Sequence, residues 1–230
     1  MTLKDLTDVI IRDISGAKNT TGNKFDGQYI AKTIHSYRAR LCEIDFKRTG
    51  FVAPIYRQDY YLQFDKNFQG SVPQGNKIIL YTLPRVITLV NRDGIEYIGG
   101  ISCSSPWRYL RNRQEMATLN GNWFTSISNH PKTIYALYDA AKTRLELYNA
   151  ENVREGLVQA VFADPCSVPT YNPDVDPYPI DEGNISELRD LILKGVTETD
   201  KAIKAEMDFN TPQNTIALPP RPTTNVKSNE

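Results

Sequence analysis

Three apolar runs of strand length lie near the centre of the sequence and are separated by short links. They are 133–138 (TIYALY), 144–148 (RLELY) and 156–162 (GLVQAVF). The link at 139–142 is short enough for the first two runs to pair as a hairpin. Successive side chains of a strand point to opposite faces, so each run can turn one face toward a core. This part of the chain therefore predicts an antiparallel β sheet or a small β sandwich.

The same two-residue period is present earlier in the chain. Tyr60, Leu62 and Phe64 alternate with more polar residues, which is the spacing of a strand with one face turned to a core. We expect these side chains to share a face with apolar residues of the later strands. The residues predicted to be mostly buried are Tyr60, Leu62, Phe64, Ile134, Leu145, Leu147 and Val158.

A second hairpin is predicted between these two regions. Residues 77–83 and 86–90 are rich in β-branched side chains. They are followed by 91–94 (NRDG), a combination typical of a tight hairpin turn, and then by the apolar run 95–98. The sequence therefore predicts that the strand after this turn pairs with the strand before it.

Helical spacing marks both ends of the chain. Apolar residues recur every three or four positions in two N-terminal segments, which predicts two helices with one apolar face each. These residues are Leu3, Leu6, Ile10 and Ile14 in the first helix and Ile30, Ile34, Tyr37 and Leu41 in the second.

Residues 181–207 have the pattern of a long amphipathic helix. Prolines recur through 211–230 and exclude a regular helix or sheet ladder, so this segment is predicted to be an extended tail.

The order of these elements predicts an α+β fold. A chain of 230 residues that is 40% hydrophobic can bury one good core, so we expect one structural domain with appendages. The predicted segments are a helical pair (1–48), a central β region with a polar insertion (51–165), a Pro-rich loop with the C-terminal helix (166–210), and the tail (211–230).

Composition limits the classes of function. The 27 basic and 27 acidic residues cancel, which is unfavourable for a protein whose main task is to neutralise nucleic-acid phosphates. No stretch approaches the ~18 apolar residues that a membrane span needs, and the N-terminus lacks an apolar signal segment. The three cysteines are widely separated and form no C-x-x-C pair, which favours a reducing compartment. We expect a soluble protein that is made in a cytoplasm and has no membrane partner.

No group of residues has the spacing of a known catalytic site. His35 and His130 fall in different kinds of element, so packed or surface histidines are favoured over a catalytic pair. The segment 99–105 (GGISCSS) lacks the second glycine of G-x-S-x-G, and a close backbone approach is the favoured interpretation. The segment 15–18 (SGAK) matches S-x-x-K but lacks its companion motifs, so it is attributed to chance.

Two charged segments remain open to a binding role. The insertion between Trp107 and Gly121 carries three arginines, and a solvated face is favoured there over phosphate binding. A group of carboxylates could gather a divalent cation but matches no calcium-loop spacing; its members are Asp174, Asp176, Asp181 and Glu182. We expect no catalytic residue, no cofactor and no bound metal, and therefore a protein that is not an enzyme.

The order of the predicted helices and strands along the chain resembles that of a known protein family. Two N-terminal helices precede 57–64 (RQDYYLQF), the strands of 133–162, the dipeptide 164–165 (DP), and the helix at 185–207. This order is similar to that of the head-to-tail connector proteins of short-tailed bacteriophages, also called adaptor or tail tubular ring proteins, with the greatest likeness to ring proteins of crAss-like phages. The resemblance covers the whole chain as an order of elements, and its motifs are degenerate. The family carries no catalytic residues.

The resemblance implies a structural ring subunit of the virion neck, which joins portal to tail. Such subunits are made in the host bacterial cytoplasm and form rings of about twelve copies through heterologous contacts. They contact the portal and the tail or neighbouring ring proteins, and packaged DNA passes through the ring during ejection without sequence-specific binding. In this chain the expected interface residues are Tyr178, Leu188, Ile192, Ile216 and Leu218.

Two other classes of function remain open. Another virion structural protein, such as a tail-fibre adaptor or a minor capsid component, shares the same neutral, tyrosine-rich character. A hydrolase that used the carboxylates after Pro165 would need a second buried partner for proton transfer, and the sequence supplies none. Electron microscopy of the purified chain distinguishes ring assemblies from a compact active monomer.

Overall fold

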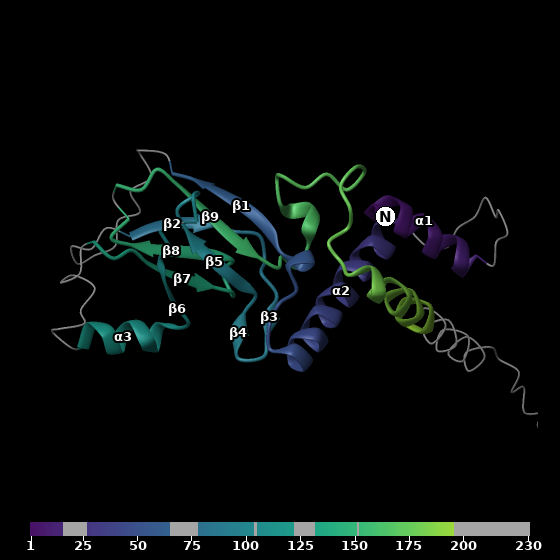
Figure 1. Cartoon of the computed structure of the whole chain (residues 1–230), viewed down its shortest axis with the longest axis horizontal. Helices are drawn as coiled ribbons and strands as arrows, with labels where there is room; N and C mark the ends of the chain where they lie inside the picture. Colours follow the sequence, from purple (N-terminus) through teal and green to yellow (C-terminus); the bar gives the residue numbers. More distant parts are fainter. Residues whose placement is uncertain (16–26, 65–77, 104, 122–131, 151, 196–230) are drawn as a thin grey trace, which may run out of the picture. The chain divides into compact units, whose positions relative to one another are not determined.

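The computed structural model describes residues 1–15, 27–64, 78–103, 105–121, 132–150 and 152–195 (Figure 1). These residues form an α+β fold, which confirms the predicted class. The chain divides into two compact units, Met1–Leu193 and Lys194–Glu230. The first unit thus includes both N-terminal helices and the described β region, and it ends inside the segment predicted as 166–210.

The first N-terminal helix is α1 (Leu3–Ile14). It begins with a capping box, in which the Thr2 hydroxyl accepts the Asp5 N–H and the Asp5 carboxylate accepts the Thr2 N–H, both at 3.1 Å. The predicted apolar face is present: Ile14 is half-buried, and its other members are buried. The buried members are Leu3, Leu6 and Ile10.

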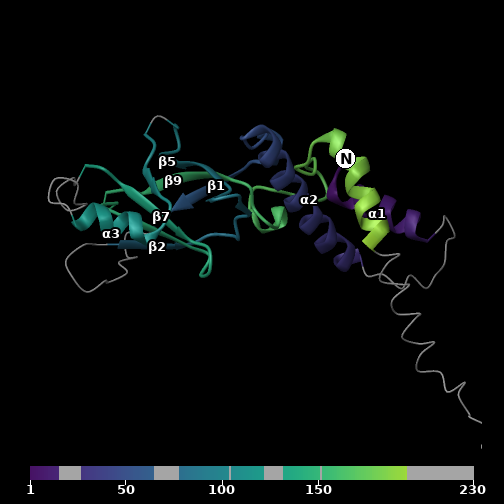
Figure 2. The ribbon, with the colours of Figure 1, turned by 90° about the horizontal axis from the view of Figure 1, so that it is seen from below.

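The second helix is α2 (Gly27–Thr49), and it packs against α1 (Figure 2). Its inner face includes the predicted apolar residues, although Tyr37 is half-buried. It also includes two polar side chains on the same buried face, His35, which directly follows Ile34, and Arg38, which lies one turn further along. All buried residues of α2 are Ile30, Ile34, His35, Arg38, Leu41 and Cys42.

Two sheets of the described chain form a β sandwich. The antiparallel first sheet has the order β1 (Gln58–Gln63), β9 (Glu155–Ala160) and β5 (Ile95–Gly99). The second has the order β2 (Ile78–Thr82), β8 (Arg144–Tyr148), β7 (Tyr135–Asp139) and β6 (Arg108–Leu110). Strands β6 and β7 are parallel, because the chain crosses over through a helix between them, so this sheet is mixed.

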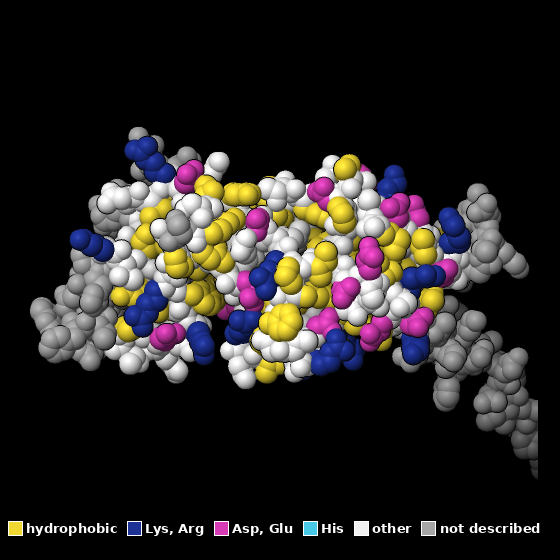
Figure 3. Space-filling model, in the orientation of Figure 1, with side chains coloured by type: hydrophobic (Ala, Val, Ile, Leu, Met, Phe, Trp, Pro, Cys, Tyr) yellow, Lys and Arg dark blue, Asp and Glu magenta, His cyan; other side chains and the backbone are white. Residues whose placement is uncertain are grey.

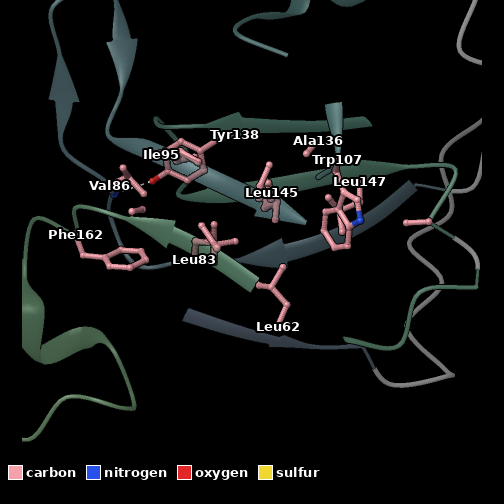
Figure 4. Packing of buried hydrophobic residues seen from close by; sticks show 14 of the residues in the cluster. Leu62, Leu83, Val86, Ile95, Trp107, Ala136, Tyr138, Leu145, Leu147 and Phe162 are labelled. Carbon is pink, nitrogen blue, oxygen red and sulfur yellow. Dashed lines mark hydrogen bonds between the residues drawn. The ribbon is translucent and has the colours of Figure 1, made fainter. Parts of the chain in front are cut away.

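The main core lies between the two sheets (Figure 4). Alternate residues of β7 and β8, such as Ala136 and Leu147, point into it, while their neighbours point to the opposite face of the sheet. The predicted core is confirmed. Its fully buried members are Leu62, Leu145, Leu147 and Val158, and its half-buried members are Tyr60, Phe64 and Ile134.

The outer face of the mixed sheet is covered by α3 (Arg113–Gly121), which forms most of the polar insertion. A second apolar cluster lies beneath this helix and consists of Leu110, Leu119, Tyr135, Leu137 and Tyr148, with Leu80 and Met116 packed against it. The buried Glu146 carboxylate accepts hydrogen bonds from Arg113 at 2.7 Å, Arg144 at 3.0 Å and Tyr148 at 2.9 Å. One of the three arginines of the insertion therefore anchors α3 to the sheet instead of facing a phosphate.

The hairpin predicted around 91–94 is shorter than expected. Strands β3 (Thr88–Leu89) and β4 (Arg92–Asp93) pair across a turn in which Asn91 has a φ of 64°. The following strand, β5, pairs with β9 instead of with the strand before the turn. Gly94 ends this small hairpin, because its N–H donates to Ile87 O at 2.8 Å and its own carbonyl accepts the Val161 N–H at 2.9 Å.

The segment after β9 folds back onto the chain and contains η3 (Pro165–Ser167) and η4 (Glu182–Asn184). It contributes Val168, Tyr178 and Ile180 to buried positions. A final helix follows and is described over 185–195. Its Arg189 guanidinium donates to the Asp13 carboxylate on α1 at 2.5 Å, which connects the two ends of the compact unit. Among the helices of the described residues, none combines the length and the apolar character of a membrane span.

Substitution of Gly94 with alanine is predicted to destabilise the sandwich. A Cβ atom at this position would lie 2.9 Å from Ile87 Cγ1 and 3.2 Å from Ile87 O, so the hairpin must shift. We expect Gly94→Ala to lower the free energy of unfolding by about 1–3 kcal/mol, measured by urea denaturation. The control is Gly27→Ala at the start of α2, where a Cβ meets no atom within 4 Å and stability should be kept or slightly increased. Equal stability of the two variants would contradict the close approach at Gly94.

Candidate functional site

A groove of about 560 Å³ runs between one face of α2 and the extended segment 85–88. The helix contributes residues one turn apart, and residues 163–164, which follow β9, complete the lining. The apolar part of the lining consists of the half-buried Ala39 and Ala163 and of Val86 and Ile87, which are themselves buried. The full lining is Lys32, His35, Ser36, Ala39, Arg40, Glu43, Arg85, Val86, Ile87, Thr88, Ala163 and Asp164.

The groove has a basic rim. Lys32, Arg40 and Arg85 are exposed and form no ion pair with any other described residue. Of the two acidic residues of the lining, Glu43 pairs with Lys47 at 2.8 Å, while Asp164 accepts the Cys166 N–H at 2.9 Å and lies 3.4 Å from the neutral His35. Three exposed cations around a partly apolar depression favour an acidic binding partner.

On the same helix as the groove residues His35 and Ala39 lies Arg38, whose side chain is fully buried. Its Nε donates to Pro179 O at 2.7 Å, Nη1 to Phe162 O at 2.9 Å and Nη2 to Tyr56 O at 3.1 Å. Burial lowers the pKa of Arg38, but a guanidinium remains charged inside a protein. These three carbonyls come from η1 (Pro54–Tyr56), from the end of the β9 region and from the loop before the last helix. The guanidinium therefore fixes these three segments to α2.

His35 lies next to this anchor and is held on both sides. Its Nδ1 is 2.8 Å from the Tyr178 hydroxyl, and its Nε2 is 3.4 Å from Asp164 Oδ1. Burial lowers the pKa of His35, although the Asp164 carboxylate opposes that change. Burial also raises the pKa of Tyr178 well above its ordinary range. At neutral pH the imidazole and the phenol are therefore both uncharged.

Cys166 lies beside this pair. The side chains of His35, Asp164 and Cys166 each place one nitrogen, oxygen or sulfur atom within 4.8 Å of the other two. Burial and the nearby Asp164 carboxylate raise the pKa of Cys166 to about 11, so the thiol stays protonated at neutral pH. A cysteine nucleophile requires a lowered pKa, so this arrangement does not favour thiol catalysis. Within the described residues, this trio is the one group with the geometry of a metal site.

Three of the predicted interface residues are not available at the surface. Tyr178 is 3% exposed, and Leu188 and Ile192 are fully buried, so their expected contacts with another chain are corrected to contacts within this one. In the described part of the last helix, Leu188 and Ile192 face their own compact unit, as does Tyr178 in the loop before it. The other two predicted interface residues, Ile216 and Leu218, lie outside the described residues, as does His130.

The other segments weighed in the sequence have structural roles where they are described. Gly99 allows a close backbone approach, because a Cβ there would meet the Tyr97 hydroxyl and lie 2.6 Å from Ser105 O. Asp176 accepts the Asn172 N–H at 2.7 Å, and Asp181 accepts the Gly183 N–H at 3.2 Å, so these carboxylates close local turns. Most of the segment 15–18 lies outside the described residues.

The loop of 172–177 (NPDVDP) presents an acidic and apolar tip. Val175 is 71% exposed, the highest exposure among the large hydrophobic side chains of the described residues, and Asp174 and Asp176 flank it. Hydrophobic side chains also remain exposed between acidic and basic ones across the face drawn in Figure 3. The chain thus presents a basic groove and, on a different segment, an acidic loop.

Arg38 and the trio beside the groove belong to no motif recognised in the sequence. Arg38 follows Ile30 and Ile34 at four-residue spacing, so a charged residue in the apolar stripe of α2 was a usable signal. The trio had no such signal, because His35 is far in sequence from Asp164 and Cys166. No protein-family model matches this chain, and no curated protein matches it.

Replacement of Arg38 by methionine is predicted to destabilise the whole compact unit. The change leaves three backbone carbonyls without their donor, so we expect the free energy of unfolding to fall by about 3–5 kcal/mol in chemical denaturation. Arg40→Met is the matched control on the exposed face of the same helix and should change stability by less than about 0.5 kcal/mol. Similar losses for the two variants would show that the Arg38 hydrogen bonds are not the anchor.

Proposed function

We propose that this protein is a structural ring subunit of a bacteriophage virion neck. In this role it joins portal to tail, and copies of the chain surround the channel through which DNA leaves the head. The proposal starts from the order of elements, in which a helical pair, a β sandwich, a long loop and a closing helix follow one another as in head-to-tail connector proteins. In this role the protein is a structural component of the virion, and the protein itself catalyses no reaction.

The observation that carries the proposal is the pair of complementary surfaces on one chain. Ring closure needs heterologous contacts, in which one patch of a subunit meets a different patch of the next copy. The groove offers Lys32, Arg40 and Arg85, which pair with no carboxylate of the described residues, around an apolar part. The loop offers the exposed Asp174 beside the exposed Val175, with the half-buried Asp176, whose carboxylate accepts the Asn172 N–H, on the other side. Opposite charge and matching apolar character support insertion of this loop into the groove of a neighbouring copy.

A second region supports contact with other proteins of the particle. Ile44 on α2 is 44% exposed, Phe51 just after the helix is 57% exposed and Ile55 in η1 is 48% exposed. These residues are close in sequence, at the turn that connects the helical pair to the sandwich. Exposed apolar residues at one end of a small unit are typical of an interaction site. In the proposed neck, the portal or an adjacent ring protein covers this end.

The charge balance is compatible with DNA that passes through a ring. Equal numbers of basic and acidic residues, 27 of each, do not favour tight neutralisation of phosphates along the channel. We therefore expect weak binding without sequence preference. Submicromolar, sequence-selective binding to duplex DNA at physiological salt would contradict the neck function.

A charge-swap experiment tests the contact between copies. Arg85→Glu in the groove and Asp174→Lys in the loop should each weaken self-association at least about tenfold, because each places like charges opposite one another. The double variant restores opposite charges and should recover association in sedimentation velocity and ring formation in negative-stain microscopy. Both residues are exposed, so the folded chain should tolerate either change.

The control is Lys142→Glu, an exposed charge reversal in the turn between β7 and β8, which should leave association unchanged. Two results contradict the proposed contact. One is a double variant that associates no better than either single variant. The other is a wild-type chain that stays monomeric both alone and in the presence of the portal protein.

Deletion of 211–230 tests the predicted role of the tail. Ile216 and Leu218 are its proposed anchors on a neighbouring subunit, since they are the large apolar residues of its central part. We expect the truncated chain to keep the melting temperature of the full chain in calorimetry while it forms fewer complete assemblies. The double variant Ile216→Ser and Leu218→Ser should reproduce the assembly defect at full length. Normal assembly of the truncated chain, or a much lower melting temperature, would contradict this role.

A further inference from the structure

We propose that His35, Asp164 and Cys166 form a zinc-binding site at the edge of the groove. The three side chains supply nitrogen, oxygen and sulfur donors that lie within 4.8 Å of one another. This mixed set suits a borderline-soft divalent cation, and zinc accepts all three donor types in four-coordinate sites. This inference is independent of the ring function, because it concerns the isolated chain.

The spacing of the donors fits a tetrahedral ion. His35 Nε2 and Asp164 Oδ1 are 3.4 Å apart. Two ligands at ordinary zinc bond lengths of about 2.0–2.1 Å stand about 3.4 Å apart in a tetrahedral site. Cys166 Sγ lies within 4.8 Å of both of these atoms, and a rotation of this exposed side chain would bring the sulfur onto the ion. His35 Nε2 and Asp164 Oδ1 are therefore already at the spacing that zinc requires, and Cys166 is the ligand that must move.

The imidazole is already oriented for this role. The Tyr178 hydroxyl lies 2.8 Å from His35 Nδ1, and Tyr178 is itself buried. When Nδ1–H donates to that hydroxyl, the lone pair of Nε2 points toward Asp164. Ligating histidines commonly carry such a hydrogen bond on the second ring nitrogen, which fixes the tautomer and the ring plane.

The other two donors are held by the turn that contains them. Asp164 Oδ1 accepts the Cys166 N–H at 2.9 Å, which closes the first turn of η3 and keeps both residues on the same side. His35 and Asp164 also line the groove, so a water molecule can reach the fourth coordination position. The bound ion would thus connect α2 to the segment after β9, beside the buried Arg38.

The charge of the three ligands balances that of a zinc ion, and the one proton that is released goes to solvent. The ligands are a neutral imidazole, a carboxylate and a thiolate, so their combined charge of about −2 is offset by the zinc cation. The Cys166 thiol loses its proton to solvent when the sulfur binds, and no oxidation or reduction takes place. Binding should therefore weaken as the pH falls, because protons compete with the metal for sulfur and imidazole.

Cobalt titration tests the site on the purified, chelator-treated full-length chain. We expect one equivalent of Co²⁺ to produce the near-ultraviolet thiolate charge-transfer absorption and the intense visible bands of a four-coordinate site. Zn²⁺ added afterwards should remove these bands, and Zn²⁺ alone should raise the melting temperature. Absence of the thiolate band in the wild-type chain at millimolar Co²⁺ would overturn the proposal.

Variants assign the ligands. Cys166→Ser should lose the charge-transfer band, and it should fold normally because the residue is exposed. Cys103→Ser, a matched change at another exposed cysteine, should keep the band and the affinity. Asp164→Asn and His35→Gln should weaken cobalt binding at least about tenfold. A band of equal strength in Cys166→Ser, or its loss in Cys103→Ser, would place the metal elsewhere and refute this site.

Discussion

The buried guanidinium of Arg38 is the interaction on which the arrangement of the compact unit depends. Moving a guanidinium out of water is costly. The cost is offset when its N–H groups form hydrogen bonds of good geometry to acceptors in the protein. Arg38 meets this condition through the carbonyls of Tyr56, Phe162 and Pro179, which belong to three separate segments. Among the described residues no carboxylate pairs with it. Displacement of any one of the three segments would leave a buried donor unsatisfied, so α2, the sandwich and the final loop are positioned together.

The candidate site follows from this anchor. His35 precedes Arg38 by one helical turn, and residues 163–164 directly follow the carbonyl of Phe162 that Arg38 holds. Fixing that carbonyl therefore fixes the lining of the groove and brings Asp164 to His35. The same anchor leaves the outer face of α2 free, and there Lys32 and Arg40 form part of the basic rim. The buried Arg38 thus positions two features. One is the basic rim of the groove, which suits an acidic partner, and the other is the trio of His35, Asp164 and Cys166, which suits a metal ion.

The periodicity of apolar residues predicted the positions of the helices and strands well, and it predicted which elements pair or pack together less well. The alternation in 133–162 indicated the strands and the inward side chains such as Leu147, because burial of one face imposes a two-residue period. It could not assign β5 to β9, because the turn at Asn91 suggested pairing across the hairpin. In the folded chain the Gly94 carbonyl accepts the Val161 N–H, and β5 continues from there along β9. Similarly, the apolar stripe with Leu188 and Ile192 was recognised, but a stripe does not state whether its own chain or another chain covers it.

The sequence by itself determined the α+β class, the helical pair, the strand positions and most of the core. Each of these depends on spacing between residues that are near one another in the chain. Only the tertiary structure decided which sheet each strand joins, that Tyr178 is internal, and that His35 meets Asp164 and Cys166. His35 and Tyr178 are separated by 143 positions, and no periodicity connects residues so far apart. Their contact lies beside Arg38, whose hydrogen bonds to three separate segments are likewise a property of the folded chain and not of any local segment.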